Sequence, residues 1–407
     1  NPDSDVPYYY RGCITMDYNL VDESVEANAR QAIEDFNQAL FLNPRSGGAL
    51  YRRGLASMTL QDYDQAIEDF DQALALDLNE ADRLNVFKYR GQAYLEQGEH
   101  MLAIGDLNQV ITLNPKSAGA FYNRGRARIR QQDYPRAVED FNQAIKLDAA
   151  LPSVYFYRGL AQAGQGNFAE AIDDYNQALE RDGWRSEVIY RRGIALSALQ
   201  HHDEAIEDFN EVLEFDGEHA QALNQRGAAL AALDDFDQAI DDYNLAINLD
   251  PRQAEFYFNR ANALCDRPAP DLAGALRDYE QALQLDRRQA PYFYRRGLVY
   301  VAQSVDSQAI EDFSEAIKLD GRLAAAFKQR GLAYTRQNLA LKAIEDFNRA
   351  IRLEPDEALL YYWRGMLYNR QGDYTKAVGD FNQAIRLAPG SVDFFDERGQ
   401  AHAHLGN

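Results

Sequence analysis

The sequence predicts an all-α protein, a linear array of about eleven complete helix-turn-helix units followed by a twelfth first helix. Two observations carry this prediction. Apolar residues recur at helical intervals along the chain, and one glycine position repeats every 34 residues, at Gly91, Gly125, Gly159, Gly193 and Gly227. A period of this length indicates that one pair of elements is stacked repeatedly, so that each unit buries its apolar face on its neighbours.

Residues 121–148 show how one unit is built. Phe121, Gly125 and Ile129 are spaced four residues apart in a first segment, and residues 137–145 hold apolar side chains three and four apart in a second. These are the intervals of amphipathic helices. Polar residues, or a glycine and a polar residue, separate the two segments, which is typical of a helix end followed by a new start. The glycine marks the closest crossing of the two helices, because bulk there would push them apart.

Each unit resembles the tetratricopeptide repeat, which has an aromatic residue, a glycine four residues later, an alanine, a Phe or Tyr, a second alanine and a closing proline. The eleventh unit carries this pattern as Tyr361, Gly365, Tyr368, Ala377, Phe381, Ala384 and Pro389. The resemblance covers essentially the whole chain and is to a bacterial-looking subtype with Arg-Gly and Asp-Phe signatures. It implies a right-handed superhelical solenoid whose first helices line a concave groove. It also implies a non-enzymatic scaffold that binds a peptide or protein segment in that groove.

We expect residues 1–407 to form a single continuous solenoid. Its parts are an irregular first repeat, a regular run, a repeat with an insertion, a second regular run and a partial repeat, at residues 5–42, 49–253, 254–286, 290–388 and 391–407. Extra residues occur at 17–28, around 78–85, and near Pro268 and Pro270, which forbid helix. We expect loops at these places, because insertions in solenoids map to loops. Such loops can carry function, or they are extensions that an array tolerates at low cost.

Arginine and aspartate occupy two positions more strictly than the family pattern requires. All twelve units have arginine directly before the glycine position, and all eleven second helices have aspartate directly before the aromatic position. An arginine fork matches a carboxylate, so we predict a structural ladder of Arg-Asp pairs, with ligand binding by the arginines as the alternative. Central members of the ladder are Arg124 with Asp140, Arg158 with Asp174, and Arg192 with Asp208. Asparagines after the aromatic position are expected on the outer surface without a role, as at Asn37, Asn142 and Asn176.

The concave face of the first helices is the expected place for a ligand. The position three residues before the glycine carries a ring in most units, including Tyr51, Tyr122, Phe156 and Tyr190. These rings either pack between adjacent first helices or form an aromatic groove for an extended segment or helix. Both interpretations are open and can hold at different repeats.

One basic stripe occurs on this face, formed by Lys88, Asn123, Arg126 and Arg130. The last three follow one another at intervals of three and four residues on one helix. The stripe resembles part of the family's clamp, in which Lys and Asn side chains of neighbouring repeats grip a terminal carboxylate. The next repeat, however, has apolar residues where the clamp requires cations. The stripe is therefore either a solvated face that neutralises nearby acids or an anion or carboxylate site.

The charge of the chain argues against several partners. Its net charge is −22 and its pI is near 4.7, and much of the acidity recurs on the second helices as part of the scaffold. Phosphate contacts need an extended basic surface, so no nucleic acid is expected, whereas cationic partners are compatible. No run of 18 apolar residues occurs, so we expect no membrane insertion.

Cysteine usage leaves the cellular compartment open. Cys13 and Cys265 lie seven repeats apart, so no disulfide framework is expected. A cytoplasmic location is the default, and an exported or extracellular one is compatible with the sequence.

No enzyme activity, cofactor or metal site is predicted. The pairs His201–His202 and His402 with His404 lack further ligands at metal-site spacing. Gly164 and Gly166 stand at a helix end, without the strand that a dinucleotide site requires. Carboxylates that recur in every unit do not form a catalytic pair.

The residues at both ends of the sequence match positions that lie inside the array in other repeats. Residues 1–4 match the loop at 43–46 that follows a second helix, and residues 406–407 match the turn at 166–167. An uncapped terminal helix leaves a packing face in water. The chain is therefore expected to be part of a longer protein, or a structural subunit whose ends stack head to tail into a filament or larger assembly.

Overall fold

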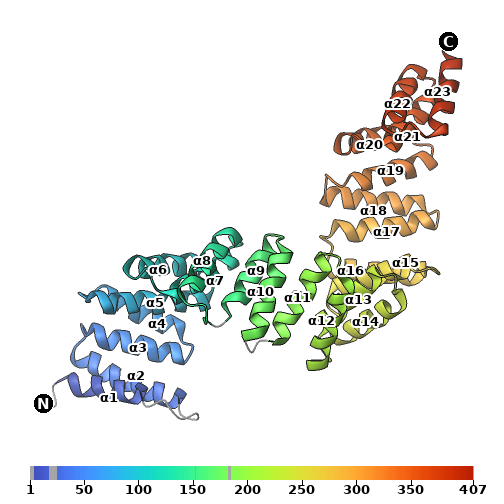
Figure 1. Cartoon of the computed structure of the whole chain (residues 1–407). Coiled ribbons are helices and arrows are strands. Elements are labelled where there is room, and N and C mark those ends of the chain that lie inside the picture. Colours follow the sequence, from blue (N-terminus) through green and yellow to red (C-terminus); the bar gives the residue numbers. More distant parts are fainter. Residues whose placement is uncertain (1–3, 18–24, 152, 182–184, 407) are drawn as a thin grey trace. The chain divides into compact units, whose positions relative to one another are not determined.

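Every regular element in the described part of the chain is an α-helix. The computed structural model describes residues 4–17, 25–151, 153–181 and 185–406, and within them it has 23 helices and no strand. First and second helices alternate to the last helix, which is a first helix without a following partner among the described residues (Figure 1). This confirms the all-α solenoid of eleven helix pairs and a twelfth first helix.

The first helices have odd numbers and the second helices have even numbers. The first helices are α1 (Val6–Asp17), α3 (Gly47–Thr59), α5 (Glu80–Gln97), α7 (Ala118–Arg130), α9 (Val154–Gly164), α11 (Arg185–Ala198), α13 (Ala220–Ala232), α15 (Ala254–Asp266), α17 (Ala290–Ala302), α19 (Ala324–Arg336), α21 (Ala358–Arg370) and α23 (Val392–His404). The second helices are α2 (Val25–Leu42), α4 (Tyr63–Leu74), α6 (His100–Leu113), α8 (Tyr134–Leu147), α10 (Phe168–Arg181), α12 (His202–Phe215), α14 (Phe236–Leu249), α16 (Leu272–Leu285), α18 (Asp306–Leu319), α20 (Ala340–Leu353) and α22 (Tyr374–Leu387).

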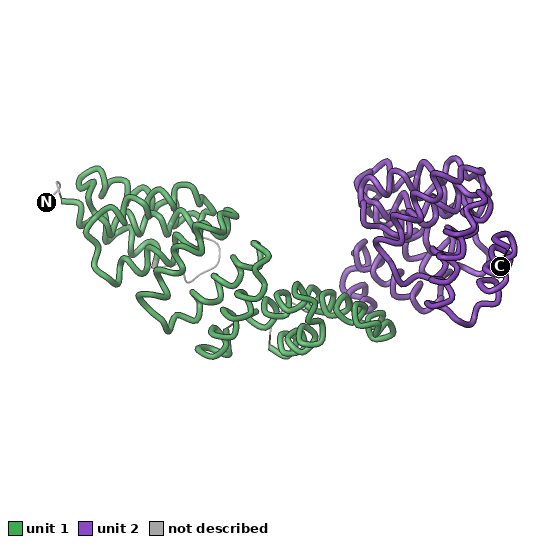
Figure 2. Tube along the Cα trace, turned by 90° about the horizontal axis from the view of Figure 1, so that it is seen from above, with its two compact units in different colours: residues 1–208 green, residues 209–407 purple. Residues whose placement is uncertain are grey.

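The chain divides into two compact units. Unit 1 is Asn1–Asp208 and unit 2 is Phe209–Asn407, so the boundary falls within α12 (Figure 2). In each unit a first helix packs against the second helix of its pair, which packs in turn against the next first helix. That a single solenoid runs through the boundary stays a prediction.

The recurring glycine lets a ring of the second helix close on the first helix. A Cβ atom at Gly125 would lie 2.7 Å from Cε1 and Cζ of Phe141, whose side chain is fully buried. A side chain at this glycine would therefore displace the ring from a close-packed core. The same approach of a ring recurs at Gly12, Gly54, Gly159, Gly227, Gly297, Gly331 and Gly365.

Most of the described turns within the pairs use a left-handed residue, and the turn from α15 to α16 does not. Gly98, Gly166 and Gly372 have φ angles of 82°, 83° and 78°, as expected of glycines that end a helix. Gln132 and Asn338 adopt φ angles of 61° and 60° in the corresponding turns. These side chains accept a conformation that glycine adopts at lower cost.

The insertion around residues 78–85 lengthens a helix, which corrects the predicted loop. α5 begins at Glu80 and has 18 residues. Asn79 caps it, because its Oδ1 accepts a hydrogen bond from the backbone N–H of Asp82 at 2.8 Å. Acidic residues in the first turn favour the same helix start through the helix dipole.

The other two insertions differ from it. α2 begins at Val25, so residues 25–28 of the first insertion are helical, while residues 18–24 lie outside the described part of the chain. Residues 267–271 join α15 to α16 without a helix, as the two prolines there require.

Candidate functional site

The predicted arginines and aspartates meet between the two helices of each pair. Arg124 donates from Nε to Oδ2 of Asp140 at 3.0 Å and from Nη2 to Oδ1 at 2.6 Å. Asp140 is only 2% exposed. The fork recurs in Arg11–Asp35, Arg53–Asp69, Arg90–Asp106, Arg158–Asp174, Arg192–Asp208, Arg226–Asp242, Arg260–Asp278, Arg296–Asp312, Arg330–Asp346 and Arg364–Asp380.

Burial raises the pKa of some of the ladder carboxyls. It raises the pKa of the Asp140 carboxyl above its ordinary value, and the hydrogen bonds and charge of Arg124 oppose that shift. Burial raises the pKa of Asp174 in the same way, against Arg158. A carboxylate held in this way is already satisfied by its arginine, so the ladder offers a ligand little.

The arginines have a second acceptor that the sequence reasoning missed. Arg158 donates from Nη1 to Oδ1 of Asn142 at 2.8 Å, on the second helix of the preceding pair. The same bond joins Arg53 to Asn37, Arg124 to Asn108, Arg192 to Asn176, Arg226 to Asn210, Arg260 to Asn244, Arg364 to Asn348 and Arg398 to Asn382. The expectation that these asparagines have no role was therefore wrong. A constant separation of 16 residues before the arginine was the signal for this pairing.

The predicted groove rings mostly pack on one another. Tyr51 lies 6.2 Å from the Phe70 ring and 6.1 Å from the Tyr89 ring, and burial raises the pKa of Tyr51 to about 12. Tyr122 lies edge-on to the Tyr157 ring at 5.6 Å. These contacts join each ring to its own second helix or to the next first helix.

Two further predicted rings are nearly covered. Phe156 is 4% exposed and Tyr190 is 9% exposed. Phe156 packs against Tyr157 and against Tyr175 of α10, at centroid distances of 5.3 Å and 6.2 Å. These rings chiefly build the wall of the first-helix face, and Phe156 also lines the hollow described next.

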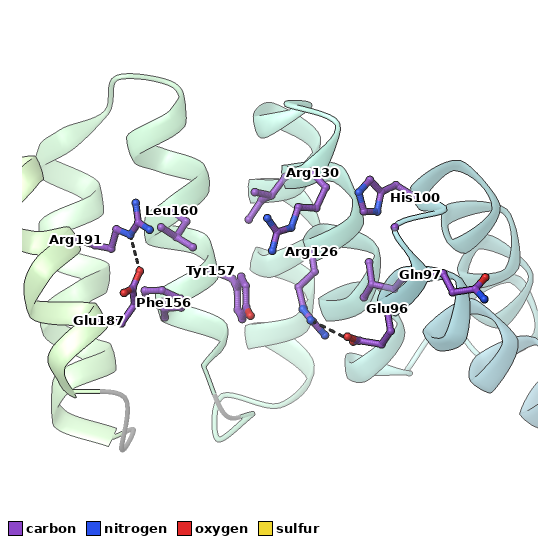
Figure 3. A pocket seen from close by; sticks show the side chains of 13 residues that line it. Glu96, Gln97, His100, Arg126, Arg130, Phe156, Tyr157, Leu160, Glu187 and Arg191 are labelled. Atoms are coloured by element: carbon purple, nitrogen blue, oxygen red, sulfur yellow. Dashed lines mark hydrogen bonds and ion pairs between the residues drawn. The ribbon is translucent and has the colours of Figure 1, made fainter. Parts of the chain in front are cut away.

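A hollow of about 640 Å³ lies on the first-helix side of unit 1 (Figure 3). Its side chains come from α5, α6, α7, α9 and α11. The lining residues are Leu95, Glu96, Gln97, Gly98, His100, Arg126, Ile129, Arg130, Phe156, Tyr157, Leu160, Glu187 and Arg191. We call this cavity the arginine hollow, because three arginines line it.

The structure brings together only part of the predicted basic stripe. Arg126 and Arg130 line the arginine hollow with Phe156, whereas Lys88 and Asn123 do not. The Nζ atom of Lys88 instead lies 5.0 Å from the centre of the Tyr89 ring. Sequence reasoning missed Arg191 as a member of this site, although it stands two residues before its glycine, in the same position as Asn123.

Two of the three arginines are held by acids at the edges of the hollow. Arg126 Nη2 lies 3.5 Å from Glu96 Oε1, and Arg191 Nε lies 2.7 Å from Glu187 Oε1 (Figure 3). Arg130 is exposed and makes no ion pair with any residue that the structure describes. The hollow thus combines three cations and two acids with apolar and aromatic walls, which suits an anionic group next to an apolar one.

The guanidinium of Arg126 is also placed by rings. Its Cζ atom lies 5.8 Å from the centre of the Tyr122 ring and 5.4 Å from that of Tyr157. Cation–π contacts of this kind hold a guanidinium in place while leaving its edge free to donate.

Other kinds of site are not found in the described residues. Across residues 4–17, 25–151, 153–181 and 185–406 no group of three or more His, Cys, Asp or Glu side chains is arranged to hold a metal ion. None of the helices in the described ranges combines the length and apolar character needed to span a bilayer.

Family models for the tetratricopeptide repeat match much of the chain. The matches are at residues 48–79, 90–152, 122–186, 186–219, 220–253 and 328–392, which together cover more than half of the sequence. No curated protein matches.

Solved structures are similar to this chain to different extents. A tetratricopeptide repeat protein from Parabacteroides merdae is 20% identical, with 62% of this chain and 98% of that chain covered and a TM-score of 0.52. YrrB, a TPR protein described as having an unusual peptide-binding site, is 21% identical, with 47% and 97% covered and a TM-score of 0.43. Yeast Tom70 is 15% identical, with 98% and 95% covered and a TM-score of 0.46.

Proposed function

Because the chain belongs to the tetratricopeptide-repeat family, we propose that it is a non-enzymatic protein-interaction scaffold that binds a segment of a partner protein in the arginine hollow. Proteins of this family bind protein or peptide partners. The observation that carries the choice of site is the convergence of Arg126, Arg130 and Arg191 on one apolar-walled hollow of an acidic chain.

The chemistry of the hollow supports an acidic, partly apolar ligand. Arg130 has no acid partner in the described chain, and Arg126 is held at the long distance of 3.5 Å. A side-chain or terminal carboxylate can bind both guanidinium groups, with Glu96 released to water. Phe156, Tyr157 and Leu160 then offer apolar surface to the neighbouring ligand residue.

The same composition supports a scaffold without catalysis. Catalytic sites combine a nucleophile or general base with a group that orients it. The arginine hollow is lined by three arginines that carry a permanent charge. Its acids are Glu96 and Glu187, which are each paired with an arginine, and His100 also lines it. The role of these groups is thus to bind.

Peptide display against the full chain tests this proposal. Selected peptides should be enriched in Asp or Glu next to an aliphatic or aromatic residue. In fluorescence anisotropy, the variant Arg126→Ala/Arg130→Ala should bind them about tenfold or more weakly, because two charge-assisted hydrogen bonds are lost. The melting temperature should change little, since Arg130 is exposed and the ion pair that Arg126 makes with Glu96 is long, at 3.5 Å.

The matched control is Arg136→Ala/Lys146→Ala on α8, which removes two exposed cations that do not line the hollow. This control should bind selected peptides as the original chain does. Equal affinity of the Arg126/Arg130 variant would remove the hollow from consideration. Loss of helical circular dichroism in that variant would instead assign the two arginines to the core.

End-to-end stacking into a filament stays an alternative function. Apolar side chains are exposed on the terminal helices, namely Val6, Tyr10 and Ile14 on α1 and Val392 and Phe395 on α23. Stacking predicts fibres that lengthen with concentration in negative-stain images. Charges introduced by Tyr10→Glu/Phe395→Glu should abolish these fibres without affecting peptide binding in the hollow.

A further inference from the structure

Two second helices carry opposite charges at three of the same four positions. Positions are counted from the aspartate of the Arg-Asp ladder, which is Asp208 in α12 and Asp346 in α20. Two of the four positions lie four residues and one residue before this aspartate, and the other two lie three residues and six residues after it. α12 has Glu204, Glu207, Glu211 and Glu214 there, and α20 has Lys342, Glu345, Arg349 and Arg352. Intervals of three and four residues place each set along one side of its helix. We call these sets the acidic row and the cationic row.

The cations of the cationic row are open to solvent. Lys342, Arg349 and Arg352 are exposed and make no ion pair with any described residue. They line a hollow of about 510 Å³ together with Arg330, Phe327, Tyr334, Glu345 and Asp346. Asp346 is already bound by Arg330, at 2.7 Å and 2.8 Å, so Glu345 is the one further acid beside the three cations.

The acidic row has no cation of its own helix to balance it. α12 contains no lysine or arginine. Glu204 lies 3.2 Å from Nδ1 of His201, in the turn before α12. Among the second helices, α12 is the one with acids at all four positions, and α20 is the one with three cations.

Each row has an exposed apolar side chain at one end. Leu341, next to Lys342 at the start of α20, is 77% exposed, and Phe215, next to Glu214 at the end of α12, is 60% exposed. Each of these side chains is therefore open to be covered where the two rows meet.

We propose that the cationic row of α20 docks antiparallel on the acidic row of α12 in a second copy of this chain. The first and last members of each row are ten residues apart, about 15 Å at the rise of an α-helix, so the rows match in length. The antiparallel arrangement sets Lys342 opposite Glu214, Arg349 opposite Glu207 and Arg352 opposite Glu204. It also brings Leu341 beside Phe215. A parallel arrangement would hold these two apolar side chains at opposite ends.

Charge complementarity within one sequence is the reason to assign a second copy as the partner. Each copy offers one acidic and one cationic row, so two copies can make two such contacts, or one contact that leaves a row free for a third copy. One pair of positions, Glu345 and Glu211, meets with like charge. The other three meet with opposite charge, which favours association and fixes the register.

Sedimentation velocity on the full chain tests the proposal. The mean mass should rise above that of a monomer over about a hundredfold concentration range at low salt, and should fall at about 0.5 M NaCl because exposed charges are screened. Arg349→Glu/Arg352→Glu should weaken self-association at least about tenfold, because two attractive pairs become repulsive. Glu204→Arg/Glu207→Arg should do the same from the other row.

A mixture of the two variants gives the sharpest result. In each variant alone, two of the three attractive pairs become repulsive, so each alone should stay monomeric. Mixed in equal amounts they should form a complex, because the unchanged acidic row of one variant meets the unchanged cationic row of the other, and the two altered rows again meet with opposite charge at these three pairs of positions. The matched control is Arg136→Glu/Lys146→Glu on α8, which reverses two cations at the first and last of the four positions and should leave self-association unchanged.

Three results would overturn the docking of α20 on α12. The original chain could remain monomeric throughout at low salt. The reversed variants could associate as strongly as the original, which would assign association to another surface. The mixture could fail to associate although circular dichroism shows both variants folded. Because Arg126→Ala/Arg130→Ala touches neither row, it should leave self-association unchanged whether or not the arginine hollow binds peptides.

Discussion

Arg158 is bound on both sides, by Asn142 of the preceding helix pair and by Asp174 of its own. Nη1 donates to Asn142 Oδ1 at 2.8 Å, and Nε donates to Asp174 Oδ2 at 2.9 Å. Each acceptor is 16 residues away from the arginine along the chain. One guanidinium thus contributes both to the stability of its own pair and to the interface with its neighbour, which are the two quantities that set the stability of a repeat array.

Asp174→Ala should destabilise the array by about 3 kcal/mol, because it leaves the largely covered Arg158 without its carboxylate. Thermal and urea melts followed by circular dichroism measure this loss. The control is Asp173→Ala, which removes the neighbouring exposed acid and should cost less than about 0.5 kcal/mol. Equal melting temperatures for both variants would contradict a stabilising role for the ladder.

Asn142→Ala should cost about 0.5–1.5 kcal/mol, because one hydrogen bond between adjacent pairs is lost. Asn142→Asp should be neutral or stabilising, since a carboxylate accepts more strongly from a guanidinium. The chain already contains this arrangement, in which Asp71 of α4 accepts from Arg90. Urea denaturation of the two variants separates them, and a loss on substitution by Asp would contradict the assigned bond.

Gly125→Ala should destabilise the fold by about 1–3 kcal/mol, because the new Cβ would lie 2.7 Å from the Phe141 ring. Gly399 is its matched control in α23, where nothing lies within 4 Å of the added atom. Gly399→Ala should therefore stabilise by up to about 1 kcal/mol through helix propensity alone. The two changes should move the melting temperature in opposite directions.

Alkaline pH should destabilise unit 1 through Tyr51. Burial raises the pKa of Tyr51 to about 12 from the ordinary 10.0, so the unfolded chain loses this proton first. The corresponding stabilisation is complete below about pH 10 and is lost as the pH rises towards 12. Urea midpoints and tyrosinate absorbance at rising pH measure this effect. Tyr51→Phe should make the loss of stability less steep, and an unchanged slope would show that the ring is hydrated.

The architecture was predictable from the sequence because local signals and the repeat agree. The glycine period, the helical spacing and the Arg-Gly and Asp-Phe pairs each repeat often enough to show the helix pairs. The loop expected around residues 78–85 was wrong because period counting shows where residues are added and not whether they continue a helix. Asn79 and the acids that follow it were the local signal for a helix start.

The candidate site was less predictable, because it depends on side chains from several units. Arg126 and Arg191 belong to different repeats, and whether each faces a ligand or an acid depends on Glu96 and Glu187 beside them. Spacing within one helix grouped Asn123 with Arg126, but the hollow is formed across helices. The asparagines of the ladder were missed because their partner stands in the next unit.

Arg158 binds one acceptor 16 residues before it and another 16 residues after it. These equal separations have a consequence for how the number of repeats encoded by such a gene can change. Deleting residues 125–158 would join Arg124 to Gly159, and Arg124 would keep Asn108 behind it and meet Asp174 at the same separation ahead. Duplicating the same stretch would preserve every such bond. Unequal recombination in steps of one repeat therefore produces longer or shorter proteins whose junctions keep these arginine contacts.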